Sequence, residues 1–178
     1  MSITLIAIGR IEKELLSILQ AGISKAFQRP VIFGQAIPEP VYAFDKRRNQ
    51  YLSTAILRVL REQPETPRYG RVLGVVDHDL YVPELHFVFG QASGTVAVIA
   101  LARLRPGFYG LPEDPRLFQQ RALTEAVHEL GHTYGLHHCV NPRCVMFFSN
   151  TLHDTDRKSS AFCLQCRVCV RRGTQAKG

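Results

Sequence analysis

The side chains with the clearest potential for chemistry lie in one short stretch of the chain, HELGHTYGLHH at positions 128–138. His128 and His132 are four residues apart, so on a helix both imidazoles project from the same face and can bind one metal ion. Glu129 is displaced from them by about a third of a turn, so its carboxylate can reach a water on that metal without being a ligand. This spacing predicts a metal site with a general base beside it.

A third histidine follows the helical pair. Gly135 favours a reversal of the chain, and three residues later His138 can return to the metal as a third nitrogen ligand. His137 is the competing candidate, but the spacing after Gly135 favours His138. Three histidines leave one coordination position open, and on zinc an open position lowers the pKa of a bound water to ~7 and polarises a carbonyl. The stretch therefore predicts the metal centre of a zinc hydrolase.

All five cysteines lie between Cys139 and Cys169, and none occurs in the first 138 residues. A disulfide framework would distribute cysteines along the chain, so this cluster indicates a second metal site. The N-terminal stretch has an apolar run too short for a signal peptide and no cleavage site before its first charges. We therefore expect a cytoplasmic protein whose thiolates stay reduced and available as ligands.

Length and composition predict a single domain over residues 1–178, with an N-terminal subdomain at 1–137 and a C-terminal subdomain at 138–178. The net charge of +7 comes from 22 Lys and Arg against 15 Asp and Glu. These cations are scattered without interleaved aromatic residues, so nucleic acid is not an expected partner, and the basic end at 167–177 is expected to be a solvated tail. No apolar run approaches the roughly 20 residues that cross a bilayer. We expect a monomer without a membrane partner.

The elements that must position these residues alternate between strand and helix. Apolar runs predict strands at residues 2–8, 31–37, 71–77, 84–89 and 95–101. Helical spacing predicts helices at residues 11–27 and 52–60, the second with Asn49 as its N-cap. The first two strands have room for crossovers and imply parallel neighbours, whereas the short links around residues 84–89 allow only antiparallel pairing. The pattern predicts an α/β fold whose mixed sheet has one antiparallel edge strand.

The third predicted helix carries the histidine pair and has the strongest boundary signals. Asp114 can cap it, Pro115 occupies the first helical position, and Gly135 permits an abrupt stop after Tyr134. The regular pattern fades after this helix, and the remaining segment of about 40 residues is too small for an apolar core of its own. We therefore expect an irregular C-terminal subdomain that a metal ion holds together.

Three segments of the sequence resemble one known family. HELGHTYGLHH resembles the extended zinc motif of the metzincin metallopeptidases, and HHCVNPRCVMFF followed by FCLQC is similar to the archaemetzincin family within them. Upstream, DLYVPELHFVFG also resembles the sheet region of archaemetzincins. The resemblance implies a metzincin-like twisted mixed sheet with backing helices, an active-site helix and a small C-terminal subdomain that zinc staples. It also implies a zinc-dependent peptidase.

The resemblance assigns roles to further residues. Met146 would be the methionine of the tight turn beneath the metal, although an isolated Met is more often a core residue. A second, structural zinc is implied, with the ligands Cys139, Cys144, Cys163 and Cys166. Spacing supports this site, because two close cysteine pairs joined by a loop are the usual form of a closed zinc site. Cys169 makes an equally good pair with Cys166, so the last pair stays open, and a redox pair is a further alternative.

Two functional hypotheses follow. The first is a peptidase with two zinc ions, in which His128, His132 and His138 hold the catalytic ion and Glu129 is the general base for hydrolysis of a peptide or protein substrate. In metzincins an antiparallel edge strand binds extended peptide, and that role falls here on residues 84–89. The alternative is a metal-stabilised module that binds peptide or nucleic acid with little hydrolysis. Glu129 favours the enzyme, because a binding module has no need of that carboxylate.

Overall fold

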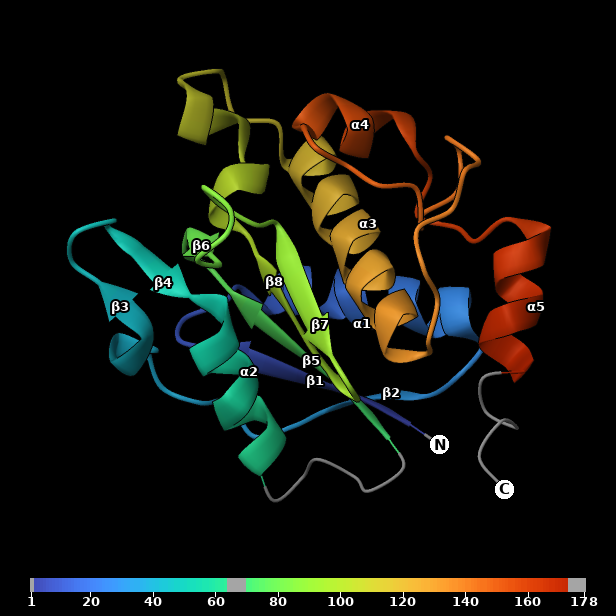
Figure 1. Ribbon diagram of the computed structural model, residues 1–178, viewed down its shortest axis with the longest axis horizontal. Helices are drawn as coiled ribbons and strands as arrows, with labels where there is room; N and C mark the ends of the chain where they lie inside the picture. Colours follow the sequence, from blue (N-terminus) through green and yellow to red (C-terminus); the bar gives the residue numbers. More distant parts are fainter. Residues whose placement is uncertain (1, 64–69, 173–178) are drawn as a thin grey trace.

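The computed structural model describes residues 2–63 and 70–172, and a five-stranded sheet lies at their centre (Figure 1). The strand order is β2-β1-β5-β8-β7, in which the first four strands are parallel and β7 pairs with β8 in the antiparallel direction. The strands are β1 (Ile3–Ile8), β2 (Val31–Phe33), β5 (Arg71–Val76), β7 (Gly90–Ser93) and β8 (Val96–Ala100). The predicted α/β fold with one antiparallel edge strand is confirmed.

Helices cover both faces of the sheet, because successive strand residues point to opposite sides. The main helices are α1 (Lys13–Phe27), α2 (Ser53–Glu62) and α3 (Pro115–Thr133). In β5, Leu73 and Val75 belong to the core under α1 and α3, whereas Val72 and Val76 belong to the core under α2. Figure 1 shows α2 and α3 on opposite sides of the sheet. Burial on both faces explains why these strands read as uninterrupted apolar runs.

The boundaries of α3 follow the sequence signals. The backbone N–H of Leu117 donates to Asp114 Oδ1 at 3.0 Å, and Pro115 occupies the first turn. The helix ends at Thr133, and Gly135 has φ of +81°, a left-handed conformation that side chains disfavour. This abrupt end turns the chain back toward the helix that it has just left.

A second, smaller sheet lies beside the first, and the sequence does not predict it. Its strands are β3 (Phe44–Asp45), β4 (Gln50–Leu52) and β6 (Leu80–Tyr81), and short 3-10 turns lie at η1 (Val41–Ala43), η2 (Ala102–Leu104) and η3 (Pro106–Tyr109). The prediction that Asn49 caps α2 is wrong. Asn49 adopts φ of +53° in the turn before β4, and the extended chain of β4 continues to Leu52, which is the residue at the N-cap.

The prediction of an edge strand at residues 84–89 is wrong in position. Only Val88 pairs there, in a single antiparallel bridge with Leu80, and the antiparallel edge strand is β7, which follows directly. Side chains from β4 and from the turn before it donate hydrogen bonds to backbone carbonyls of this segment. Arg48 Nη2 donates to the carbonyl of Leu85 at 2.8 Å, and Gln50 Nε2 donates to the carbonyl of His86 at 2.9 Å.

The C-terminal part is more regular than predicted. It contains α4 (Leu152–Arg157) and α5 (Leu164–Arg172), and Figure 1 shows this orange to red segment beside α3. The expected solvated tail at residues 167–177 is a helix as far as residue 172, and its Val170 is buried against the core, whereas Arg167 and Arg171 are exposed as expected. Residues 173–177 lie outside the described residues. Within the described residues, no helix is long and apolar enough to cross a bilayer.

Candidate metal centres and active-site cleft

The predicted histidine triad converges on one point at the end of α3. His128 and His132 lie one turn apart on the same helix face, and their Nε2 atoms are 3.1 Å from each other. The reversal after Gly135 brings His138 to the same place, so that the candidate ligand nitrogens of the three residues all lie within 4.8 Å of one another. The structure thus brings together the three histidines that the sequence analysis selected. His137 is exposed and lies outside the group.

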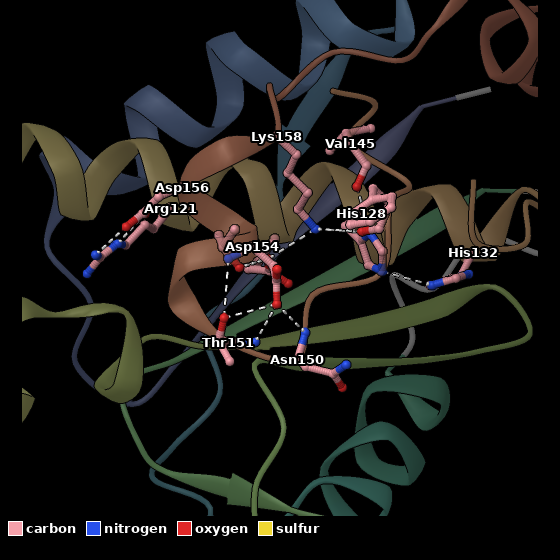
Figure 2. Close-up of polar contacts among 12 residues, drawn as sticks. Arg121, His128, His132, Val145, Asn150, Thr151, Asp154, Asp156 and Lys158 are labelled. Carbon is pink, nitrogen blue, oxygen red and sulfur yellow. Dashed lines mark hydrogen bonds and ion pairs between the residues drawn. The ribbon is translucent and has the colours of Figure 1, made fainter. Parts of the chain in front are cut away.

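Backbone carbonyls hold the two helical imidazoles in position. His128 Nδ1 lies 2.7 Å from the carbonyl of Val145, and His132 Nδ1 lies 2.8 Å from the carbonyl of Leu136. Such short contacts are hydrogen bonds only if Nδ1 carries the proton, which leaves the Nε2 lone pair of each ring for a metal. Figure 2 shows Val145 on one side of the His128 ring and His132 on the other.

The electrostatic surroundings keep these imidazoles neutral. The pKa of His128 is lowered to about 3, mainly by burial and then by the nearby Lys158 ammonium. Burial also lowers the pKa of His132 and of His138. Neutral imidazoles are the form that binds metal ions. Two tetrahedral zinc nitrogens with Zn–N of roughly 2.0–2.1 Å are about 3.3 Å apart, close to the observed Nε2 separation, so the donor set fits zinc.

Glu129 lies beside the triad at the base of a cavity of about 430 Å³. The pKa of its carboxyl is raised to about 8, mainly by burial and then by the like charge of Glu125. A carboxyl with a pKa near neutrality can both accept and release a proton at pH 7. The cavity runs between the segment 85–92, which includes the start of β7, and the segment 148–150, and the three histidines line it together with Glu129.

Four of the five cysteines form a second cluster. The sulfur atoms of Cys139, Cys144, Cys163 and Cys166 all lie within 4.8 Å of one another. Cys139 Sγ and Cys163 Sγ are 3.9 Å apart, and zinc sulfurs at Zn–S of about 2.3 Å in a tetrahedron are about 3.8 Å apart, so this donor set also fits zinc. Cys169 is exposed and lies outside the group.

The surroundings of the cysteine cluster also suit a metal ion. The backbone N–H of Cys163 donates to Cys144 Sγ at 3.3 Å, and a hydrogen bond from the backbone N–H of Cys166 lowers the pKa of Cys163 to about 7. Burial raises the pKa of Cys144 and of Cys166. These two thiols need a nearby cation to be thiolates at neutral pH, and a bound metal supplies that charge.

Met146 lies directly beneath the active-site helix. It is completely buried, and its sulfur packs against Gly131, where a Cβ would collide with it. The glycine within HELGH therefore gives the room in which the methionine sits. The backbone also joins the two clusters here, because the N–H of Cys139 donates to the carbonyl of Met146 at 2.9 Å.

This packing predicts that the effect of Gly131→Ala on stability changes sign when the Met146 side chain is removed. In a helix interior, alanine in place of glycine stabilises by about 1 kcal/mol, but overpacking of a core is unfavourable by about 1–3 kcal/mol. We expect Gly131→Ala to lower the melting temperature in the wild-type chain and to raise it in the Met146→Ala background, where the collision is absent. Thermal unfolding of the wild type, the two single variants and the double variant measures this. The same stabilising effect in both backgrounds would show that the methionine does not occupy this space.

Sequence reasoning missed three residues of the site. The Glu129 side chain packs against Gly90 of β7, and Glu125 lines the cavity one turn before the triad. Lys158 lies beneath His128 with its side chain 0% exposed. Only Glu125 had a sequence signal, since it precedes Glu129 by four residues on a predicted helix. Lys158 had none, because a single lysine in a polar segment is expected to be exposed to solvent.

Comparison with known proteins gives the family. The model of peptidase family M54 matches residues 31–172. The archaemetzincin of Pyrococcus abyssi is 41% identical over 171 residues, which cover 92% of this chain and 91% of that protein. The chain belongs to the archaemetzincin family. It is therefore a zinc-dependent peptidase, and peptides are its substrates.

Solved structures agree with this family. The crystal structure of the archaemetzincin from Methanopyrus kandleri matches with a TM-score of 0.85 and 39% identity over 98% of this chain and 96% of that one. A zinc-dependent peptidase from Methanocorpusculum labreanum matches with a TM-score of 0.85 and 31% identity over 94% of this chain and 99% of that one. These matches include the N-terminal third, which lies outside the three segments that carry the resemblance in the sequence analysis. In this archaemetzincin the histidine triad and the cysteine cluster are two candidate metal sites.

Proposed function

We propose that His128, His132 and His138 hold the catalytic zinc of this peptidase and that Glu129 is its general base. One observation carries the proposal: the three ligand nitrogens converge within 4.8 Å in a cavity that the Glu129 carboxylate also lines. A zinc ion at these nitrogens would lower the pKa of a water to ~7 and polarise the scissile carbonyl. Three protein ligands leave the open position that this chemistry requires.

Glu129 moves the proton of the reaction. Its carboxylate takes a proton from the attacking water as the oxygen bonds to the scissile carbonyl carbon. The same carboxyl then delivers this proton to the leaving amine nitrogen as the C–N bond breaks, so that the immediate products are an amine and a carboxylic acid, and the acid releases its remaining proton to solvent at neutral pH. Burial against β7 keeps the carboxyl at the cavity and away from bulk water.

The substrate is proposed to lie along β7 (Gly90–Ser93). This strand forms the edge of the five-stranded sheet, and its outer backbone groups can pair with an extended peptide. Its residues Gly90, Gln91 and Ala92 line the same cavity as Glu129, so a peptide paired with β7 passes the triad. The exposed ring of Phe148 lies across the cavity from β7, with its centroid 4.7 Å from that of His138.

The cysteine cluster is proposed to hold a structural zinc that fixes residues 138–178 against residues 1–137 within one domain. A closed set of four thiolates has no position for a substrate, which is typical of a structural site. Cys139 follows His138 directly and bonds through its N–H to Met146, so the structural site also supports the turn beneath the triad.

The proposal predicts two zinc ions per chain and peptide hydrolysis that depends on the more weakly held one. The histidine site should lose its ion to a chelator first, because its open position exchanges ligands. Elemental analysis combined with cleavage of a diverse peptide library measures both quantities, before and after chelation and zinc addition. One ion or none per chain after zinc supplementation would contradict the proposed sites. Hydrolysis that survives the removal of the first ion would contradict the catalytic assignment.

A further inference from the structure

Lys158, the residue that follows α4, places a cation in the interior directly behind the histidine site. Its side chain is 0% exposed, which is rare for lysine and strongly unfavourable unless the charge is paired. The proposed zinc chemistry does not use this residue. Its position therefore needs another explanation.

The Lys158 ammonium has three neighbours from two parts of the chain. Nζ donates to the carbonyl of Phe147 at 3.2 Å and forms an ion pair with Glu125 Oε1 at 3.4 Å. It also lies 3.4 Å from His128 Nδ1, on the side away from His132 (Figure 2). The Nδ1 proton is directed at the carbonyl of Val145, so Lys158 lies against the ring at this distance without a hydrogen bond to it. Glu125 and His128 belong to α3, whereas Phe147 belongs to the turn beneath it.

The backbone segment to which Lys158 donates, residues 145–148, also orients the triad. Within residues 145–148, the carbonyl of Val145 holds His128, Met146 packs under α3, and the ring of Phe148 contacts His138. The hydrogen bond from Lys158 to the carbonyl of Phe147 therefore restrains a segment that contacts both His128 and His138. Glu125 anchors the other end of this link, and Thr155 Oγ1 of α4 also donates to Glu125 Oε1 at 3.1 Å.

We propose that Lys158 is a positioning residue for the histidine site: its buried ammonium ties residues 145–148 to α3 and so fixes His128 and His138 for metal binding. The inference rests on the proposed function of the triad as a metal site. Removal of groups that orient metal ligands typically weakens metal affinity by about 10–100-fold. A lysine with only a packing role would change stability and leave that affinity alone.

A neighbouring ion pair supplies a matched control. Arg121 also belongs to α3 and pairs with Asp156 of α4, with N–O distances of 2.7 Å (Figure 2). In the described part of the chain, neither residue forms a hydrogen bond or ring contact with the triad or with residues 145–148. Arg121→Met therefore removes a link between α3 and α4 without touching the metal site. Asp156 is 31% exposed, so water can hydrate its carboxylate in that variant.

The test measures Co²⁺ affinity of the histidine site by visible absorption, in chains whose cysteine site retains zinc. We expect Lys158→Met to weaken this affinity at least tenfold and Arg121→Met to stay within twofold of wild type. Lys158→Met also leaves Glu125 as a buried, unpaired carboxylate, which destabilises the fold. The double variant Glu125→Gln/Lys158→Met removes both charges, and we expect its melting temperature to recover while its Co²⁺ affinity stays low.

The outcomes separate the inference from the function on which it rests. Wild-type affinity in Lys158→Met, or affinity that recovers together with stability in the double variant, would overturn the positioning role and leave the triad intact as a metal site. A wild-type chain that takes no Co²⁺ at the histidines would overturn the proposed site and this inference together.

Discussion

Replacement of Glu129 by alanine is expected to lower peptide hydrolysis by about a hundredfold or more, with little change in zinc content or melting temperature. The carboxyl lies at the cavity beside the triad and outside the group of ligand nitrogens, so its loss removes the proton acceptor and leaves the metal ligands in place. The raised pKa shows that the folded chain disfavours the charged form of this group. Removing it therefore also removes an unfavourable buried charge, which limits the loss of stability.

Two histidine variants calibrate this experiment. His132→Ala removes a ligand nitrogen and should lower both the zinc content and hydrolysis, whereas His137→Ala changes an exposed neighbour outside the triad and should lower neither. Glu129→Gln keeps the shape of the side chain and should be as inactive as Glu129→Ala. Equal hydrolysis by wild type and Glu129→Ala would assign the activity to another site or a contaminant.

The part of the site that the sequence predicts is the part with local causes. The spacing of His128 and His132 fixes their common helix face, and Asp114 and Gly135 fix the two ends of that helix. His138 is found by the same local argument, because it follows the reversal at Gly135 by only three positions. The buried strands are predictable for a similar reason, since burial on both faces produces apolar runs that need no tertiary information.

The part that the sequence does not predict depends on distant partners. The residues of β7 (Gly90–Ser93) have little strand preference, and their pairing with β8 determines their conformation. Residues 84–89 have the alternation of a strand, yet the side chains of Arg48 and Gln50 take their carbonyls. Long-range polar contacts also position the C-terminal helices. The ion pair between Arg121 and Asp156 joins residues 35 positions apart, and no local pattern indicates it.

The cysteine cluster gives the second large prediction. Serine at position 139, 144, 163 or 166 is expected to lower the zinc content from two ions to one and to lower the melting temperature by at least about 10 °C, since each lost kcal/mol shifts this temperature by about 2–4 °C and a structural zinc contributes several. The cluster joins the turn that carries Cys139 and Cys144 to the start of α5, and buried residues of both segments pack into the main core. Cys144→Ser should have the largest effect, because this sulfur is 1% exposed and accepts the N–H of Cys163.

Cys169→Ser is the matched control, and it decides the pair that the sequence leaves open. Cys163 and Cys169 stand at equal distances on either side of Cys166, so spacing cannot separate them. The fold distinguishes them, because α5 begins at Leu164. Cys163 precedes the first turn of this helix, and its sulfur lies 3.9 Å from that of Cys139. Cys169 lies farther along the helix and is exposed. We expect Cys169→Ser to keep two zinc ions and the wild-type melting temperature. If Cys163→Ser kept both zinc ions and the wild-type melting temperature while Cys169→Ser lost one ion and stability, the ligands would be Cys139, Cys144, Cys166 and Cys169. That result would require an orientation of α5 different from the observed one.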